Sequence, residues 1–271
     1  MPELPEVETT CQGISPYIIG NTLAHVIVRE AQLRWLIPND LAQTISGLQI
    51  THVRRRGKYC LLNTSRGTLI LHLGMSGNLR IVTTDEPIKK HDHVDFIFIN
   101  NTVLRFNDQR KFGAVLWAEN DGIQHPLLKD LGPEPLTADF NGETLYYQAK
   151  GRKIPVKTFI MDGHIVVGVG NIYANESLFM AGIAPTRAIG TLSLDDCQKL
   201  SIAIKTVLQR AIELGGTTLK DFVNAQGKPG YFSQSLAVYG RAGLPCYWCQ
   251  HQIQLIKIGQ RASYFCPVCQ T

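Results

Sequence analysis

The chain begins Met1-Pro2-Glu3-Leu4-Pro5-Glu6-Val7-Glu8, a run that combines two prolines with three glutamates. If Met1 is removed, Pro2 carries a free secondary amine, and free α-amino groups titrate near about 8. An unprotonated amine of this kind can attack a carbon at the aldehyde oxidation level and form an iminium. Glu3 is the nearest proton donor or acceptor, and Glu6 shares its face if a helix starts here. Pro2 is therefore a candidate nucleophile.

The same residues also have a purely structural interpretation. Pro5 suits the first turn of a helix, and Glu6 and Glu8 suit the positive end of its dipole. From Glu6 to about Ile19 the apolar residues allow an amphipathic helix, and Gly20 is a typical stop. Composition alone favours this structural interpretation, so the catalytic one needs support from elsewhere in the chain.

Length and composition set the broad class of the protein. The 271 residues are 44% hydrophobic and 18% charged, which is ordinary for a globular chain with two domains. The net charge of +5 is compatible with a polyanionic partner but does not require one. No apolar run is long enough to span a bilayer, and the acidic start lacks the apolar core of a signal peptide. We expect a cytoplasmic protein without a membrane partner.

The first half of the chain is rich in short β-like runs separated by glycine, asparagine, aspartate and proline. Many short strands at close spacing predict an antiparallel sandwich or barrel. The expected strands are residues 22–29, 47–54, 59–63, 68–73, 78–82, 94–99, 103–106 and 114–118. A rigid linker, Leu131-Gly132-Pro133-Glu134-Pro135, then marks a boundary. We place the β-domain at residues 1–133.

After the linker the pattern becomes helical. The predicted helices are residues 139–149, 154–162, 171–180 and 193–214. The turn Gly168-Val169-Gly170-Asn171 opens one of them, and its free backbone N–H groups suit a phosphate. It is not a dinucleotide fingerprint, because no βαβ unit surrounds it. We expect a helical domain at residues 134–240.

The strongest local motif lies at the end of the chain. Two Cys-x-x-Cys pairs are separated by sixteen residues, and their members are Cys246, Cys249, Cys266 and Cys269. This spacing is typical of a structural four-cysteine zinc site. The residues between the pairs alternate in polarity and predict a β-hairpin with Arg261 near its tip. We therefore expect one Zn²⁺ and a zinc-finger hairpin at residues 241–271, although the motif alone does not indicate DNA.

Several loop residues have both a structural and a binding interpretation. The basic run at residues 54–58 can be a solvated strand edge or a phosphate-binding cluster. Met75, between two glycines, can fill the core or form a protruding tip. Phe112 lies in a polar turn, where an exposed aromatic is unusual unless it inserts into something. His91 and His93 are a weak metal pair without a third ligand.

These motifs together resemble one known family. Met-Pro-Glu-Leu-Pro-Glu-Val-Glu-Thr is similar to the start of formamidopyrimidine-DNA glycosylases, bacterial enzymes that remove oxidised purines such as 8-oxoguanine. The resemblance extends through residues 72–77, 108–113 and 168–173 to the cysteine finger with Arg261. The related endonuclease VIII branch typically has glycine in place of Leu4, so this chain resembles the purine-repair branch more closely. A non-catalytic damage binder is the other alternative, and intact Pro2, Glu3 and Lys58 count against it.

The resemblance implies a fold and an activity. The implied fold is α+β: an antiparallel β-sandwich with an N-terminal helix, then a helical domain with a helix–two-turns–helix element and a four-cysteine zinc-finger β-hairpin. The implied activity is excision of oxidised purines from duplex DNA through a Schiff base at Pro2, followed by strand cleavage by β,δ-elimination. The implied catalytic residues are Pro2, Glu3, Glu6, Lys58 and Arg261, with Glu3 as acid/base partner and zinc in a structural role.

The resemblance also implies contacts with double-stranded DNA that carries oxidised purines or abasic sites. The implied DNA-binding residues are His72, Met75, His91, Arg110, Phe112, Arg152, Lys157 and Asn171. A loop containing Lys220 and Tyr231 would cover the everted base. The least family-like stretch is residues 151–155, where Pro155 closely precedes Lys157. We expect the protein to act as a monomer.

Overall fold

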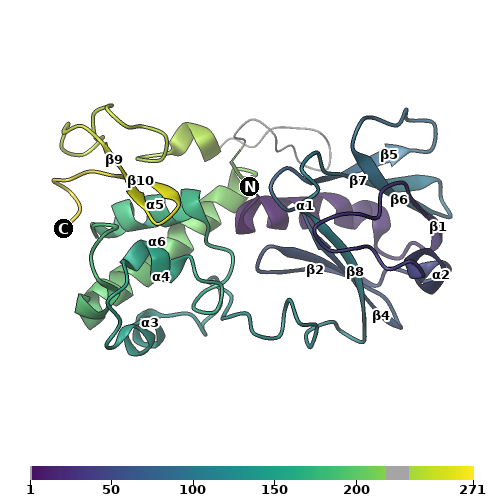
Figure 1. The fold of residues 1–271 in the computed structure, drawn as a ribbon, viewed down its shortest axis with the longest axis horizontal. Helices are drawn as coiled ribbons and strands as arrows, with labels where there is room; N and C mark the ends of the chain where they lie inside the picture. The colour runs from purple at the N-terminus through teal and green to yellow at the C-terminus, as the bar shows by residue number, and fades with distance from the viewer. Residues whose placement is uncertain (1, 218–231) are drawn as a thin grey trace. The chain divides into compact units, whose positions relative to one another are not determined.

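The computed structural model describes residues 2–217 and 232–271, and the chain folds into two compact units (Figure 1). Unit 1 comprises Met1–Lys129 and Leu214–Tyr231, and unit 2 comprises Asp130–Glu213 and Phe232–Thr271. The division of the chain into three domains, with boundaries near 133 and 240, stays a prediction.

Two four-stranded antiparallel sheets form the body of unit 1. Their strand orders are β1-β6-β7-β5 and β2-β3-β4-β8. The strands are β1 (Leu23–Val28), β2 (His52–Arg56), β3 (Tyr59–Asn63), β4 (Gly67–His72), β5 (Asn78–Thr83), β6 (Asp92–Phe98), β7 (Thr102–Asn107) and β8 (Ala114–Glu119). They follow the predicted strands closely, because alternation and turn residues dominate this part of the chain.

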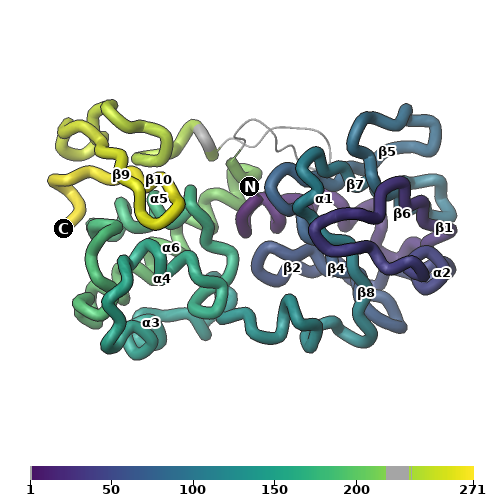
Figure 2. Tube along the Cα trace, in the orientation of Figure 1, coloured from purple at the N-terminus to yellow at the C-terminus, as the bar shows by residue number. Residues whose placement is uncertain are grey.

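Helix α1 (Leu4–Ile18) packs against strands of both sheets, and both ribbon and tube views place it alongside them (Figures 1 and 2). Its apolar face buries Val7, Ile14 and Ile18 in the core cluster of the sandwich. Full burial of such a side chain is worth about 1.5–3 kcal/mol relative to exposure. The first turn of the chain is therefore fixed by the core of unit 1.

One predicted strand begins later than expected, and one short helix was not predicted. Residues 47–50 bond to the chain around β1 instead of extending β2: Leu23 N donates to Leu48 O and Gly20 N donates to Ile50 O. Helix α2 (Leu41–Ile45) buries Leu41 and Ile45. One turn is too short to show helical periodicity in a sequence.

Unit 2 is built from helices. They are α3 (Gly142–Ala149), α4 (Val156–Ile160), α5 (Asn171–Ala181) and α6 (Leu194–Glu213), with short 3₁₀ turns at Ile189–Thr191 and Phe232–Ser235. Helix α6 packs against α3 and α5. Helix α3 starts later than predicted because the Asn141 side chain accepts from Thr144 N and caps it. Helix α4 is shorter because Pro155 stands at its N-cap.

The C-terminal hairpin completes unit 2. Strands β9 (Gln254–Ile258) and β10 (Arg261–Phe265) pair antiparallel, and β10 contacts α5. Arg261 opens β10, directly after the turn at Gly259 and Gln260, as predicted. The predicted α+β fold is confirmed. Within the described ranges, no helix is both long and apolar enough to cross a membrane.

Candidate active site and nucleic-acid interface

The start of α1 brings three candidate catalytic residues together in unit 1. Pro2, Glu3 and Glu6 are all buried. The Glu3 N–H donates to Glu6 Oε2 at 2.8 Å, so the two glutamates lie on one face of the first turn. Glu6 Oε1 accepts the N–H of Thr217 at 2.7 Å. Glu6 therefore ties the chain start to Thr217, shortly after the end of α6.

Lys58 lies in the tight turn between β2 and β3, beside the positive-φ residue Gly57. The neighbouring arginines have structural partners. Arg55 Nε pairs with Glu8 Oε2 at 2.8 Å, and Arg54 Nε donates to Asn63 Oδ1 at 2.8 Å. The basic run is thus divided: Arg55 braces α1 and Arg54 braces β3, while Lys58 occupies the turn.

His72, at the end of β4, is electrostatically linked to this turn. The pKa of His72 is lowered to about 4, mainly by burial and also by the positive charges of Lys58 and Arg34. Its imidazole is therefore neutral near pH 7. Nδ1 accepts the N–H of Gly74 at 2.9 Å, which leaves the proton on Nε2. His72 can donate one hydrogen bond to a phosphate but does not add a charge.

Two loops of unit 1 carry Met75, Arg110 and Phe112; we call residues 73–77 and 108–113 the wedge loops. Phe112 is 41% exposed, Arg110 is exposed and Met75 is partly exposed. The Arg110 guanidinium lies 4.7 Å from the centre of the Phe112 ring. Lys111, in left-handed conformation, pairs with Glu30 and lowers the pKa of that carboxyl. The structure thus places the loop that carries Met75 next to the loop that carries Arg110 and Phe112.

His91 precedes β6 in a left-handed conformation with φ 72°, so it does not alternate with His93 along a strand. His93 Nε2 lies 2.7 Å from Asp108 O. Among the described residues, only the four-cysteine group meets the geometry of a metal site, so the histidine pair gains no support.

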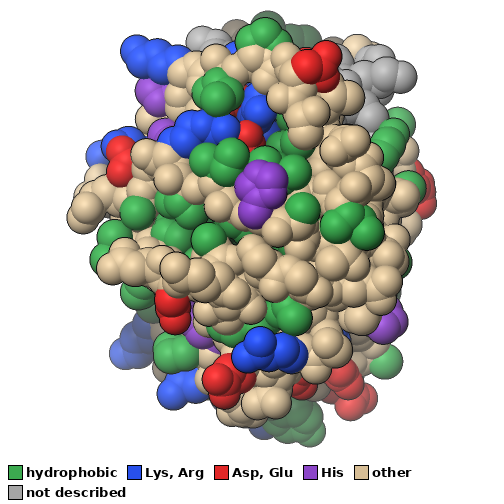
Figure 3. All heavy atoms as spheres, turned by 90° about the vertical axis from the view of Figure 1, so that its right-hand side faces the viewer, with side chains coloured by type: hydrophobic (Ala, Val, Ile, Leu, Met, Phe, Trp, Pro, Cys, Tyr) green, Lys and Arg blue, Asp and Glu red, His purple; other side chains and the backbone are tan. Residues whose placement is uncertain are grey.

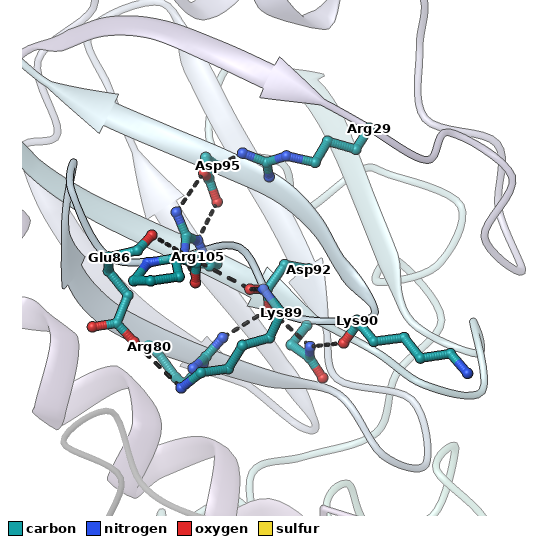
Figure 4. A network of polar contacts seen from close by, with 10 residues as sticks. Arg29, Arg80, Glu86, Lys89, Lys90, Asp92, Asp95 and Arg105 are labelled. Atoms are coloured by element: carbon teal, nitrogen blue, oxygen red, sulfur yellow. Dashed lines mark hydrogen bonds and ion pairs between the residues drawn. The ribbon is translucent and has the colours of Figure 1, made fainter.

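A polar network next to the turn that carries His91 fixes the position of that turn (Figure 4). Asp92 accepts from Arg80 at 2.7 Å and from the Lys89 N–H at 2.8 Å. Arg105, only 2% exposed, pairs with Asp95 at 2.8 Å and donates to the backbone of residues 86 and 87. The loop that leads to His91 is therefore held from within the sheet.

Charges of both signs are mixed on the face of the molecule that Figure 3 shows. Figure 3 shows one face of the molecule, on which Lys and Arg side chains are scattered among Asp, Glu and uncharged groups. Such a mixed face is not typical of a polyanion-binding surface.

In unit 2, Asn171 begins α5 directly after Gly170, as predicted, and Gly168 adopts a φ of 83°. Asn171 Oδ1 is buried without a hydrogen-bond partner among the described atoms. Asn175, one turn later, donates to Asn171 O at 2.5 Å, and its Oδ1 accepts the N–H of Tyr264 at 2.8 Å. Asn175 therefore connects the start of α5 to the hairpin.

Lys157 is buried against the C-terminal hairpin. Its side chain is 2% exposed, and Nζ donates to Ala262 O and Ser263 Oγ, each at 2.7 Å. Both acceptors follow Arg261 in β10. Contact of Lys157 with DNA stays a prediction, while its visible contacts brace the hairpin. Arg152 is exposed and lies over the Phe159 ring at 5.3 Å.

Glu176 is a residue that the sequence analysis missed. It is 5% exposed and accepts the backbone N–H groups of Ala237, Val238 and Tyr239 at 2.8, 3.0 and 2.8 Å. Burial raises the pKa of Glu176, against the lowering effect of these three bonds. A charged residue within a helix that otherwise holds only apolar and uncharged polar residues was the available signal. It anchors the segment that leads into the cysteine hairpin.

The four cysteines converge as predicted. Their sulfur atoms all lie within 4.8 Å of one another, with Cys246 and Cys269 at 3.9 Å and Cys249 and Cys266 at 3.4 Å. Zinc–thiolate bonds of about 2.3 Å in a tetrahedron place sulfurs roughly 3.8 Å apart. The donor set fits a tetrahedral metal ion.

The predicted loop residues Lys220 and Tyr231 lie outside the described residues.

Comparison with known proteins identifies the family. Residues 1–115 match the formamidopyrimidine-DNA glycosylase N-terminal domain, and residues 131–223 match the formamidopyrimidine-DNA glycosylase H2TH domain. The chain belongs to the formamidopyrimidine-DNA glycosylase family. The predicted family and the predicted glycosylase class of enzyme are confirmed.

The similarity to individual members of the formamidopyrimidine-DNA glycosylase family covers the whole chain. The chain is 54% identical over 270 residues to the enzyme of Marinobacter nauticus and 55% identical over 272 residues to that of a Marinomonas species, and each alignment covers 100% of both proteins.

Solved structures of formamidopyrimidine-DNA glycosylases have the same fold as this chain. A mutant of the Lactococcus lactis enzyme in complex with Fapy-dG-containing DNA has a TM-score of 0.93 at 33% identity, over 100% of both chains. The Thermus thermophilus enzyme has a TM-score of 0.89 at 36% identity, over 99% of this chain and 98% of that one.

Proposed function

We propose that this protein is a bifunctional DNA repair enzyme, a glycosylase and abasic-site lyase that excises 8-oxoguanine and formamidopyrimidines from duplex DNA. The observation that carries the proposal is the buried Pro2–Glu3–Glu6 arrangement at the head of α1. Relatives of the same fold support the substrate class, since the Lactococcus lactis enzyme has been crystallised with Fapy-dG DNA and with abasic-site DNA. The site of action would be the bacterial cytoplasm, with the enzyme working as a monomer.

The chemistry begins at the Pro2 nitrogen once Met1 has been removed. The damaged nucleotide must leave the duplex first, because C1′ cannot be reached inside the stack. The amine attacks C1′, the bond from C1′ to the base breaks, and the base departs with a proton. The bond from C1′ to O4′ then breaks, O4′ takes a proton, and the ring-opened sugar remains on Pro2 as an iminium. Glu3, adjacent and buried, moves protons at the sugar and the base.

Strand cleavage follows from the iminium. The positive nitrogen acidifies C2′, and loss of that proton expels the 3′ phosphate in the first elimination. A second elimination expels the 5′ phosphate, and hydrolysis of the iminium frees Pro2. Lys58, in the β2–β3 turn, is the candidate for phosphate contact and proton transfer in unit 1.

Base extrusion and backbone binding use the remaining candidates. Met75 and Phe112 would fill the space left by the flipped nucleotide, and Arg110 would bond to the orphaned partner base. Neutral His72 and the His91 turn would donate to phosphates from unit 1. In unit 2, Asn171 and Arg261 would bind phosphates.

Zinc is the metal that we propose for Cys246, Cys249, Cys266 and Cys269. Thiolate ligands and tetrahedral spacing favour it. Bound zinc would act structurally by holding the β9–β10 hairpin, and therefore Arg261, in place.

The experiment is borohydride trapping with duplex DNA that carries one 8-oxoguanine. Borohydride reduces an iminium, so a covalent protein–DNA complex is expected, and peptide mapping should place the link at Pro2. The matched control is the same duplex with an undamaged guanine. If no complex forms and the lesion strand stays intact, the protein is a binder and the catalytic proposal is wrong. Preference for an oxidised pyrimidine would instead indicate the endonuclease VIII type of substrate.

A further inference from the structure

One buried carboxylate, at the start of the second wedge loop, bonds to residues of both wedge loops. Asp108 follows β7 directly and is 0% exposed. Its Oδ1 accepts the Ser76 hydroxyl at 2.8 Å, in the first wedge loop. Its Oδ2 accepts the Gly113 N–H at 2.7 Å, in the second. Oδ1 also accepts the Arg110 N–H at 3.3 Å. Asp108 therefore holds both loops at once.

The backbone of Asp108 reaches a third segment. Its N–H donates to His91 O at 3.1 Å. Its carbonyl oxygen lies 2.7 Å from His93 Nε2. The turn that presents His91 is thus connected to the same residue as the wedge loops. All these contacts lie within unit 1.

The two wedge loops also touch directly. A Cβ added to Gly74 would meet Phe112 C at 2.5 Å and Gly113 N at 2.6 Å, closer than real Cβ contacts. The loops are packed backbone against backbone, so a shift of one displaces the other. The Ser76 hydroxyl adds a second link, because it also accepts the Arg110 N–H at 3.1 Å.

The partners of this carboxylate distinguish it from others in the same sheet. Asp92 and Asp95 pair with arginines (Figure 4), whereas the hydrogen bonds to Asp108 come from neutral hydroxyl and amide groups. A buried charge without a cation is a costly way to stabilise a fold. Several convergent acceptor bonds are, however, an effective way to fix the orientation of two loops.

We propose that Asp108 is the positioning residue of the base-extrusion step: it sets Met75, Arg110 and Phe112 in the register in which they replace the flipped nucleotide. The inference rests on the proposed function. It predicts a selective defect, because an abasic site offers no damaged base to extrude. Loss of Asp108 should slow cleavage of lesion-containing duplex and leave the sugar chemistry nearly intact.

The test compares single-turnover cleavage of two duplexes, one with 8-oxoguanine and one with an abasic site. In Asp108→Asn an amide NH₂ or a weaker acceptor faces the Gly113 N–H and the Ser76 hydroxyl. We expect roughly a 100-fold loss on 8-oxoguanine, the order produced by misplacement of about 1 Å, and at most about a tenfold loss on the abasic duplex. Ser76→Ala removes the hydroxyl's bonds to Asp108 Oδ1 and to the Arg110 N–H but leaves the bond from the Gly113 N–H to Asp108 Oδ2. It should therefore lower the ratio of the 8-oxoguanine rate to the abasic-site rate by less than Asp108→Asn does.

Asp95→Asn is the matched control, since it removes a buried carboxylate of the same sheet that contacts neither wedge loop. It should lower the melting temperature without changing the ratio of the two rates. A 2-aminopurine beside the lesion gives a direct readout, because its fluorescence rises when neighbouring bases unstack. That rise should be slower in Asp108→Asn than in the wild type.

The outcomes separate the two proposals. If the wild type neither cleaves nor traps either duplex, the proposed function fails. If the wild type is active and Asp108→Asn slows both duplexes equally, only the role of Asp108 fails. That role also fails if Asp95→Asn changes the ratio as strongly. Should Asp108→Asn not fold, Ser76→Ala decides. A lowered ratio of the 8-oxoguanine rate to the abasic-site rate in Ser76→Ala supports the role of Asp108, and an unchanged ratio contradicts it.

Discussion

The Glu6 carboxylate accepts the backbone N–H of Thr217 at 2.7 Å across a separation of 211 residues. Its other oxygen accepts the Glu3 N–H at 2.8 Å. One buried side chain therefore joins the head of α1 to the segment after α6. Any displacement of that segment reaches Glu3, beside the proposed nucleophile.

Gly216 provides a way to disturb this link. It has a φ of +83°, and an added Cβ would meet Glu6 Oε1 at 3.1 Å and Cγ at 3.2 Å. Gly20 has a φ of +78° with nothing within 4 Å, so it is a matched control for the backbone cost alone. Both alanine variants should lose about 1–2 kcal/mol of unfolding free energy. Only Gly216→Ala should also reduce cleavage by about tenfold or more; equal activity of the two variants would contradict the link.

Pro2→Gly keeps a terminal amine but replaces the secondary amine by a primary one. A primary amine forms a neutral imine that must gain a proton before it activates the sugar, whereas proline forms a cationic iminium directly. Borohydride-trapped complex should therefore accumulate more slowly in the variant. The measurement is the trapping rate on abasic duplex, with circular dichroism to verify folding. A trapped adduct that maps to a lysine in the wild type would refute the assignment.

Removal of the metal should unfold the hairpin without unfolding the sandwich. Elemental analysis of the native protein should give one zinc per chain. Because a structural site couples metal binding to local folding, chelation should abolish DNA binding while the far-UV spectrum of the β-sandwich persists. Restored binding after zinc addition is the control. Full DNA affinity in zinc-free protein would show that the hairpin does not need the metal.

Salt dependence can distinguish Arg261 from Lys157. Binding affinity falls with salt in proportion to the number of phosphates neutralised. Arg261→Ala should reduce the magnitude of that slope by about one. Lys157→Met should lower the melting temperature and the affinity but keep the slope, because Nζ donates to the hairpin at Ala262 and Ser263. A slope reduced by one in Lys157→Met would indicate a direct phosphate contact instead.

Phe112→Ala tests the wedge itself. With 41% of the residue exposed, truncation leaves no large cavity, so the melting temperature should change little. Activity on 8-oxoguanine duplex should fall far more than activity on an abasic duplex, where no base is extruded. Ile99→Ala, at another exposed apolar position of unit 1, is the control and should retain both activities. A large drop in melting temperature with equal losses would show Phe112 to be a core residue.

Local signals in the sequence were sufficient for several features. Alternation and turn residues predicted β3 at its observed bounds. The Cys-x-x-Cys spacing predicted the sulfur cluster, and the alternation between the two pairs predicted the hairpin with Arg261 near its tip. The Glu3–Glu6 pair followed from the spacing of one helical turn. These features depend on residues close together in the chain, where periodicity and motif spacing carry the information.

Contacts between distant residues were decided only by the tertiary structure. The sequence did not reveal that Glu6 would accept from Thr217, that Lys157 would turn toward the hairpin, or that Asp108 would clamp two loops. An acidic or basic residue looks alike in a sequence whether it faces solvent or a buried donor. Its partner is set by the packing of sheets and helices, because a buried charge must find hydrogen bonds wherever the fold supplies them.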